Sequence, residues 1–141
     1  MAIYFEFVSN HSLLFVGLLL VIILLLQTIF SDVTRKYKLI SPPEAIGLIN
    51  REDAVVIDTR NKAEFDGGHI SDAILIPLPE IKESTEKLNK YEGRPLLFYC
   101  KSGLRSDEAC KVLSKLGINN VYALSGGIQA WEDANMPLVK K

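Results

Sequence analysis

Charge is missing from the beginning of this chain. No lysine or arginine precedes Arg35, and residues 7–31 include no charged side chain of either sign. Residues 13–26 have no strongly polar side chain, and extending this apolar run to Phe30 gives a helix of about 27 Å, close to the hydrocarbon thickness of a bilayer. A domain of about 100 residues has little room to surround a helix that is apolar on every side. We therefore predict one N-terminal transmembrane helix at 13–30 rather than a buried core helix.

A basic segment and a cleavage site are also missing around this run. A secretory signal peptide needs both, whereas only Glu6 is charged ahead of the run and residues 27–30 offer no pair of small residues. We therefore predict an uncleaved single-pass anchor whose partner is the lipid bilayer. Because Arg35, Lys36 and Lys38 follow the run, the positive-inside rule predicts an N-terminus outside and a cytoplasmic C-terminal domain, as in a protein of the bacterial inner membrane.

Cysteine is scarce, and basic residues are not in excess. Cys100 and Cys110 are too few for a disulfide framework. The net charge of the chain is −1 and no basic patch is visible, which argues against nucleic acid as a partner. The expected organisation is a short tail at 1–12, the anchor at 13–30, a charged linker at 31–40 and one domain at 41–141.

Helix and strand patterns alternate after residue 40, which predicts one α/β domain with a mainly parallel sheet. Ser41-Pro42-Pro43-Glu44 has the N-cap, the proline and the acidic residue of a helix start. The clearest helical pattern runs from Leu104 to Leu116 and is ended by Gly117. Shorter helices are expected at 61–65, 79–88 and around Trp131, and buried strands at 54–57, 73–76, 96–99 and 121–124.

Cys100 follows the apolar run 96–99 and opens the loop Cys100-Lys101-Ser102-Gly103-Leu104-Arg105-Ser106, after which a helix begins. The thiol is therefore expected at the carboxyl end of a buried strand and beside a helix N-terminus. Gly103 can adopt backbone angles that let the loop curl around the sulfur and turn its N–H groups inward. These donors, the helix dipole and Arg105 favour a thiolate over a thiol. The pattern indicates a nucleophilic cysteine for sulfur or phosphate chemistry, with Arg105 in reach of an oxyanion group.

Four segments of the chain, in this order, resemble the rhodanese family. Asp58-Thr59-Arg60 resembles its D-x-R signature, and residues 64–73 resemble its E-F-x-x-G-H-I-x-G-A segment. The loop at 100–106 resembles its C-x-x-G-x-R-S active-site loop, and residues 124–131 resemble its closing L-x-G-G-x-x-A-W segment. Together the four segments span nearly all of residues 40–138.

The resemblance implies a rhodanese-like single domain with a mainly parallel five-stranded sheet flanked by helices, and activity as a sulfurtransferase. Cys100 would take sulfane sulfur from a small donor such as thiosulfate, carry it as a persulfide and pass it to a thiol or protein-thiol acceptor. The resemblance implies no metal and no organic cofactor. Cys100 is then the catalytic residue, and the substrate-binding residues are Lys101, Ser102, Gly103, Leu104 and Arg105.

Side chains outside the loop are expected to support the site rather than to react. Asp58 is expected to pin the neighbouring loops. Arg60 and Glu64, four residues apart at a helix start, are expected to form a structural ion pair. His69 is expected to make a structural hydrogen bond, although a role as a base is the alternative.

Five other positions carry weaker expectations. Trp131 is expected to anchor the last helix in the core, and Cys110 is expected to pack, since it lies too far along its helix to reach the loop cysteine without rearrangement. The side chain of Lys101 either tunes the choice of substrate or points to water. Asp72 and Asn135 depart from the family pattern at positions where glycine is usual, although asparagine tolerates left-handed backbone angles.

Two other functions fit parts of the pattern. Related phosphatases and arsenate reductases have five residues between cysteine and arginine, whereas four lie between Cys100 and Arg105. The tighter loop suits one added sulfur atom better than a tetrahedral phosphate. Rhodanese-like domains also serve as non-catalytic binding or regulatory modules, and an anchored one could recruit a membrane partner. Such modules often lack the cysteine, so the presence of Cys100 with Arg105 favours an enzyme.

Overall fold

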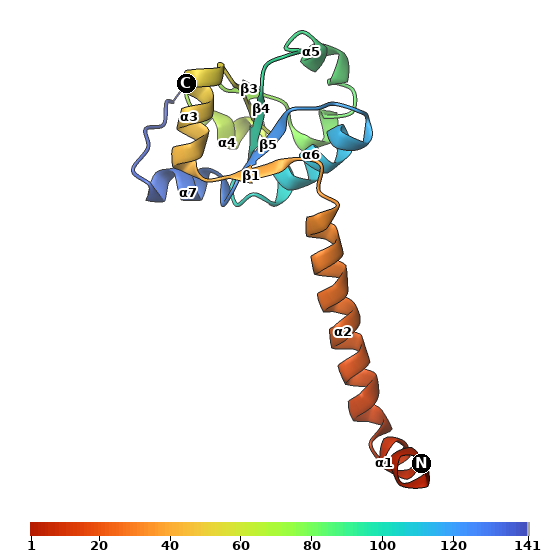
Figure 1. Cartoon of the computed structure of the whole chain (residues 1–141). Helices are drawn as coiled ribbons and strands as arrows, with labels where there is room; N and C mark the ends of the chain where they lie inside the picture. The colour runs from red at the N-terminus through yellow and green to blue at the C-terminus, as the bar shows by residue number, and fades with distance from the viewer. Residues whose placement is uncertain (141) are drawn as a thin grey trace. The chain divides into compact units, whose positions relative to one another are not determined.

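The computed structural model describes residues 1–140. They fall into two compact units, one formed by Met1–Arg35 and the other by the residues from Lys36 onward. The first unit is helical, and the second contains a sheet with helices on both faces (Figure 1). The α/β class expected from the sequence is therefore confirmed for the second unit.

The first unit consists of α1 (Ala2–Asn10) and α2 (Ser12–Val33). The helix predicted at 13–30 lies within α2. The stretch Ser12–Ser31 is long and apolar enough to cross a membrane, and none of its most apolar part is buried within the protein. The segment predicted as a short tail is itself helical, because α1 occupies most of residues 1–12.

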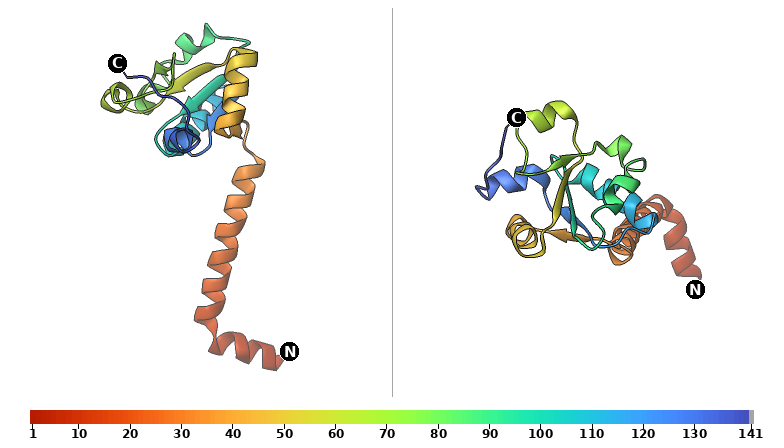
Figure 2. Two further views of the ribbon diagram at one scale, coloured as in Figure 1. Left: turned by 90° about the vertical axis from the view of Figure 1, so that its left-hand side faces the viewer. Right: turned by 90° about the horizontal axis from the view of Figure 1, so that it is seen from above.

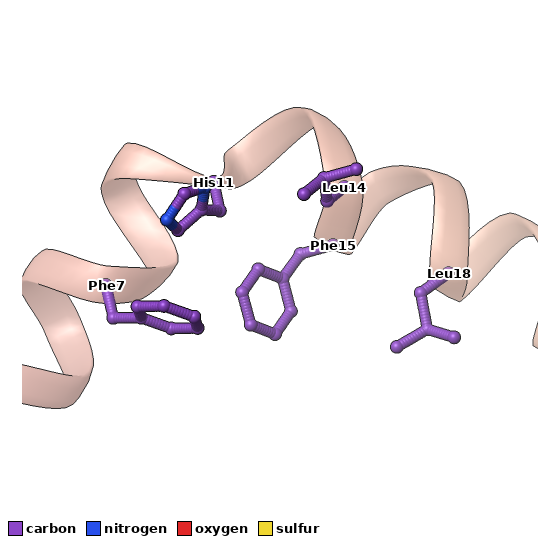
Figure 3. Close-up of a pocket in the computed structure, with 5 residues that line it drawn as sticks. All are labelled: Phe7, His11, Leu14, Phe15 and Leu18. Atoms are coloured by element: carbon purple, nitrogen blue, oxygen red, sulfur yellow. The ribbon is translucent and has the colours of Figure 1, made fainter.

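An aromatic cluster lies at the bend between these two helices. His11 interrupts the helical backbone with φ −119° and ψ 28°. Phe7 and Phe15 gather beside it (Figure 3), with ring centroids 4.7 Å apart for Phe7 and His11 and 6.3 Å apart for Phe7 and Phe15. Leu14 and Leu18 continue this apolar cluster along α2. The ring contacts join the end of α1 to the first turns of α2.

The second unit is built on one parallel sheet with the strand order β1-β5-β4-β2-β3. In the register of the sheet, Asp58 lies beside Tyr99. Because all strands run the same way, the loops after β2, β4 and β5 leave from one edge. The five-stranded sheet implied by the resemblance is confirmed. The strands are β1 Lys38–Ile40, β2 Val55–Asp58, β3 Ile74–Leu75, β4 Leu96–Tyr99 and β5 Val121–Leu124.

Local sequence accounts for the helix ends in this unit. Glu44 Oε2 accepts a hydrogen bond from the Ser41 backbone N–H at 2.7 Å, and Asn61 Oδ1 accepts one from the Glu64 N–H at 2.8 Å. Gly117 has φ 83° just after the longest of these helices. The helices are α3 Pro42–Glu52, α4 Lys62–Asp66, the 3₁₀ helix η1 Leu78–Glu80, α5 Thr85–Asn89, α6 Leu104–Lys115 and α7 Gly127–Asp133.

Hydrophobic clusters cover both faces of the sheet. Alternate residues of β4 divide between them, with Leu96 and Phe98 in one cluster and Leu97 and Tyr99 in the other. Helices α5 and α6 lie on one face of the sheet and α3 and α7 on the other, as Figures 1 and 2 show. The first cluster includes residues of α5 and α6, and the second includes residues of α3 and α7. Burial on both faces explains why the sequence of β4 is continuously apolar rather than alternating.

The segment predicted as a linker at 31–40 has regular structure at both ends. The residues up to Val33 continue α2, and Lys38–Ile40 form the edge strand β1. The side chain of Tyr37 is buried and donates a hydrogen bond to Asp107 in the first turn of α6. Two of the three β1 residues are exposed, so this strand lacks the continuous apolar run that marks β2 and β4.

Asp72 and Asn135, the two departures from the family pattern, both have left-handed backbone angles. Their φ values are 61° and 58°. Short polar side chains tolerate this region better than most residues do. The local turn geometry that favours glycine is therefore kept at both positions.

Candidate active site

Three loops meet at the carboxyl edge of the sheet, and Cys100 lies in the middle one. It follows directly after β4 and is only 1% exposed. The loop after β2 lies on one side of it, since the Thr59 N–H and Oγ1 both contact the Tyr99 carbonyl oxygen at 3.0 Å. The Gly126-Gly127 turn after β5 lies on the other side. The predicted position of Cys100 at a buried strand end is confirmed.

The loop curls back so that a backbone amide meets the sulfur. Gly103 has φ 105°, and its N–H donates to Cys100 Sγ at 3.0 Å. Ser106 Oγ lies 3.7 Å from the same sulfur and donates its own hydrogen to the Gly103 carbonyl oxygen at 3.0 Å. A backbone N–H is thus the polar group that the loop places against the Cys100 sulfur.

The start of α7 holds the loop from outside. The Ile128 N–H donates to the Cys100 carbonyl oxygen at 2.8 Å, and the Gln129 N–H donates to the Lys101 carbonyl oxygen at 3.2 Å. The peptide bonds are trans, so the N–H groups of Lys101 and Ser102 point away from α7. Helix α7 thus sets the orientation of two peptide planes of the Cys100 loop.

Gly127 allows this close approach. A Cβ atom at Gly127 would lie 2.5 Å from the Cys100 carbonyl oxygen and 2.6 Å from the Lys101 carbonyl oxygen. Its φ of 60° also favours glycine. Sequence reasoning did not assign Gly127 and Ile128 to the site, although the paired glycines after the last strand were the sign of a tight backbone contact.

Arg105 makes a two-pronged ion pair with Glu64. Its Nη1 and Nη2 lie 2.9 and 3.0 Å from Glu64 Oε2 and Oε1, and both side chains are about one-third exposed, at 36% and 28%. The Arg105 hydrogen bonds are the main cause that lowers the pKa of Glu64 to about 2. The fork of Arg105, predicted to be in reach of an oxyanion group of a substrate, thus binds a carboxylate of α4 in this structure.

The ion pair predicted between Arg60 and Glu64 is wrong. Arg60 instead binds Asp58, with Nη2 2.7 Å from Oδ2 and Nε 3.0 Å from Oδ1, and its Nη2 also donates to the Gly68 carbonyl oxygen. Asp58 also accepts the Arg60 backbone N–H at 2.9 Å. Both side chains are buried. Asp58 pins the loop after β2, as expected from the sequence.

His69 makes structural contacts. Its Nδ1 lies 2.9 Å from the Phe65 carbonyl oxygen, and its ring stacks on that of Phe65 at 3.8 Å. Its backbone N–H and carbonyl both bind Val139, which fastens the C-terminal segment to the region after α4. These contacts fit the structural hydrogen bond predicted for His69.

Trp131 and Cys110 are buried as expected. Trp131 is 4% exposed and its Nε1 donates to the Pro137 carbonyl oxygen at 3.1 Å. Cys110 lies within α6, with Sγ 3.7 Å from the Tyr122 carbonyl oxygen. Burial is the main cause that raises the pKa of Cys110, and both cysteines are free thiols.

The remaining loop side chains face solvent. Lys101, Ser102 and Leu104 are exposed, Leu104 by 79%. Lys101 also lines a cavity of about 300 Å³ that lies between α4 and α7 and reaches Glu64. Within residues 1–140, no three His, Cys, Asp or Glu side chains come close enough together to hold a metal ion.

The chain is similar to known proteins in both sequence and fold. The model of the family described as Rhodanese-like domain matches residues 41–134. The uncharacterized protein YibN of Escherichia coli K12 is 35% identical over 136 residues, which are 96% of this chain and 95% of that protein. Thiosulfate sulfurtransferase GlpE of Coxiella burnetii is 33% identical over 96 residues, 68% of this chain and 88% of that protein. A crystal structure of a rhodanese-related protein from Thermoplasma volcanium superposes with a TM-score of 0.67 at 30% identity, covering 74% of this chain and 100% of that chain.

Proposed function

Because this chain belongs to the rhodanese-like domain family, we propose that it is a sulfurtransferase that carries sulfane sulfur on Cys100. The Cys100 thiolate attacks the outer sulfur of a donor such as thiosulfate. The sulfur–sulfur bond of the donor breaks, sulfite leaves with the bonding electrons, and a new sulfur–sulfur bond makes Cys100 a persulfide. A thiol or protein thiol then takes the outer sulfur as its own persulfide and restores the thiolate. Since no electrons are gained or lost overall, the cycle requires no redox cofactor.

The observation that carries this proposal is the hydrogen bond from the Gly103 N–H to Cys100 Sγ at 3.0 Å. A buried thiol without such a donor would be held in its neutral, unreactive form. The sulfur also lies beside the N-terminus of α6, a helix of 12 residues whose dipole favours negative charge there. A persulfide would extend the same negative charge by one sulfur atom, within the range of these dipoles.

Each of the remaining loop residues has a place in the proposal. Gly103 supplies the amide donor and the left-handed backbone that the curl requires. Arg105 supplies positive charge beside the sulfur for an anionic donor. Lys101, Ser102 and Leu104 are exposed, and there they can contact a donor or an acceptor. Asp58, Arg60, Glu64 and His69 hold the surrounding loops through the contacts described above.

The relatives support the sulfurtransferase activity at the level of the family. GlpE is by name a thiosulfate sulfurtransferase, and its similarity covers 68% of this chain. The similarity to YibN extends over 96% of this chain and so includes most of the apolar N-terminal region. The alternative of a phosphatase has less support, because four residues rather than five separate Cys100 from Arg105.

We also propose that α2 anchors the domain to a bacterial inner membrane in a single pass. The stretch Ser12–Ser31 is free of charge, and Arg35, Lys36 and Lys38 follow it. This asymmetry favours a translocated N-terminus and a cytoplasmic domain. Protease added outside intact cells should therefore leave the domain whole, and should digest it after the inner membrane is opened. Digestion in intact spheroplasts would contradict the proposed orientation.

The activity itself is tested with thiosulfate as donor and cyanide as acceptor. Cyanide takes the outer sulfur of the persulfide as thiocyanate, whose formation can be followed directly. We expect turnover with the full chain in detergent or lipid, without added metal. Hydrolysis of a small aryl phosphate in the absence of thiocyanate formation would overturn the proposal in favour of a phosphatase. Full rescue of a null strain by Cys100→Ser would overturn it in favour of a binding module.

A further inference from the structure

The positive charge that should attract an anionic donor is already neutralised. Both terminal nitrogens of Arg105 bind the Glu64 carboxylate, at 2.9 and 3.0 Å. The lowered pKa of Glu64, about 2, means that the carboxylate stays charged at any physiological pH. A doubly charged donor that needs the Arg105 fork must therefore displace an ionised carboxylate.

The other charges around the loop cancel in the same way. The Arg60 guanidinium forms a salt bridge with the Asp58 carboxylate. Lys101 and Glu132 lie at the cavity between α4 and α7, and within residues 1–140 neither takes part in a salt bridge. Counted together, these residues bring as much negative as positive charge to the approach to Cys100. The surroundings of the sulfur therefore offer little net attraction to a dianion.

The total charge at the sulfur distinguishes two classes of donor. Thiosulfate carries two negative charges and meets a thiolate, so three negative charges gather as the reaction begins. The persulfide of a zwitterionic thiol such as cysteine has a net charge of minus one, or zero when the persulfide is protonated, because the ammonium and the carboxylate of the carrier cancel. Like charges a few ångströms apart repel one another near a protein surface. A site whose charges cancel, and whose Arg105 fork is occupied by Glu64, thus favours the donor with fewer negative charges.

The cavity beside the loop provides space for the thiol part of such a donor. It has a volume of about 300 Å³, at the lower end of the range for ligand pockets. Ile128 and Leu138 contribute apolar surface, while Lys101 and Glu132 contribute charges of opposite sign. A small thiol that carries both an ammonium and a carboxylate group, such as cysteine or a short peptide, matches this lining.

On the premise of the proposed sulfurtransferase activity, we propose that the preferred donor is the persulfide of a small zwitterionic thiol rather than thiosulfate, and that Glu64 sets this preference by occupying Arg105. The Cys100 thiolate attacks the outer sulfur of the persulfide. The donor's sulfur–sulfur bond breaks and a new one forms on Cys100, while the carrier leaves as a thiolate that takes a proton from water. The step is an exchange without net oxidation.

The test compares the rate constant for loading sulfur onto Cys100 from thiosulfate and from cysteine persulfide, in the full chain and in variants. For the unaltered protein we expect the persulfide to be more efficient by at least about tenfold. Glu64→Gln keeps an oxygen that can accept the Asn61 N–H at the helix cap, yet frees the charge of Arg105. It should shift the ratio of the two donors toward thiosulfate by about tenfold, which corresponds to about 1.4 kcal/mol.

A matched control separates this contact from charge in general. Asp66→Asn removes the same charge from the same helix, but Asp66 pairs with Lys62 rather than with Arg105, so the donor ratio should stay unchanged. Glu132→Gln tests the cavity, and should raise the KM for the persulfide several-fold without raising the KM for thiosulfate.

Three results would overturn the donor preference while leaving sulfur transfer intact. They are a thiosulfate rate equal to or above that of the persulfide, a fall in the thiosulfate rate in Glu64→Gln, and an equal shift in Asp66→Asn. A fall in the thiosulfate rate would mean that Glu64 instead positions Arg105 for the dianion. Loading of Cys100 by neither donor would overturn the sulfurtransferase activity, and the donor preference with it.

Discussion

The two cysteines of this chain are both buried and both free, yet their surroundings differ. Cys100 lies in a loop, and its sulfur receives the Gly103 N–H at 3.0 Å. Cys110 lies within α6, and its sulfur faces a carbonyl oxygen, an acceptor that cannot stabilise a thiolate. Burial, followed by the charges of Asp107 and Cys100, raises the pKa of Cys110. Burial therefore does not decide whether a thiol is reactive, whereas the polarity of the groups that face it does.

The largest effect is expected from replacing each of the two cysteines with serine, one at a time. Cys100→Ser should lower sulfur transfer at least about a thousandfold, since a hydroxyl is a far weaker nucleophile and cannot carry a persulfide. Cys110→Ser should keep the rate of sulfur transfer within about twofold, because we expect Cys110 to contribute packing alone. Thiocyanate formation measures both variants. Comparable losses in the two variants would break the distinction between the cysteines.

The next effect concerns the backbone that shapes the loop around Cys100. Gly127→Ala would place a Cβ 2.5 Å from the Cys100 carbonyl oxygen, so the loop or α7 must shift. We expect a fall in kcat/KM of about a hundredfold, because small displacements of reacting groups are costly. The same thiocyanate assay measures it.

Gly117→Ala is the matched control for this glycine. Gly117 also has a positive φ, of 83°, but a Cβ there meets no atom within 4 Å. Both substitutions should lower the free energy of unfolding by about 1 kcal/mol or more through backbone strain. Only Gly127→Ala should also lose activity, and equal activity in the two variants would show that α7 does not set the loop geometry.

A smaller effect is expected from Arg105. Arg105→Ala removes positive charge beside the sulfur and leaves the ionised Glu64 without its partner, so the KM for thiosulfate should rise by about tenfold. The double variant Arg105→Ala/Glu64→Gln should recover part of this loss, because the unpaired negative charge is gone. A KM for thiosulfate that does not change in Arg105→Ala would remove Arg105 from the binding of the donor.

The smallest effect is a dependence of stability on pH. The pKa of Glu64 is about 2 in the folded protein against 4.5 ordinarily, so its contribution is complete above pH 4.5 and is lost as the pH falls toward 2. Since the pair is partly exposed, the contribution is about 1 kcal/mol or less. Denaturant unfolding of the unaltered protein and Glu64→Gln at several pH values measures it. A difference that is constant from pH 7 to pH 3 would contradict the account of this pair.

Elements with a complete local pattern were predictable from the sequence. Strand β4 reads as a short, continuous apolar run, and α6 has an apolar stripe that ends at a glycine, so both were placed within a residue of their bounds. Strand β1 has only three residues, two of them exposed, and owes its place to pairing with β5, which is more than 80 residues away in the chain. No local pattern could mark it.

Contacts within the site show the same limit. The spacing of four residues between Arg60 and Glu64 favours a local ion pair. In the structure, however, Arg60 binds Asp58. Glu64 binds Arg105, which lies 41 residues further along the chain. The hydrogen bonds from α7 to the Cys100 loop are likewise made between distant segments. Sequence reasoning placed Cys100 and its loop at the end of a buried strand, whereas the partners that hold them depend on how the chain folds over the sheet.

The most direct test of the central claim is peptide mapping by mass spectrometry after the purified protein has been incubated with excess thiosulfate. We predict one additional sulfur atom on the peptide that contains Cys100, its removal by cyanide, and an unmodified Cys110. Sulfur on Cys110 instead, or on neither cysteine, would contradict the claim that the amide of Gly103 and the start of α6 make Cys100 the sulfur carrier.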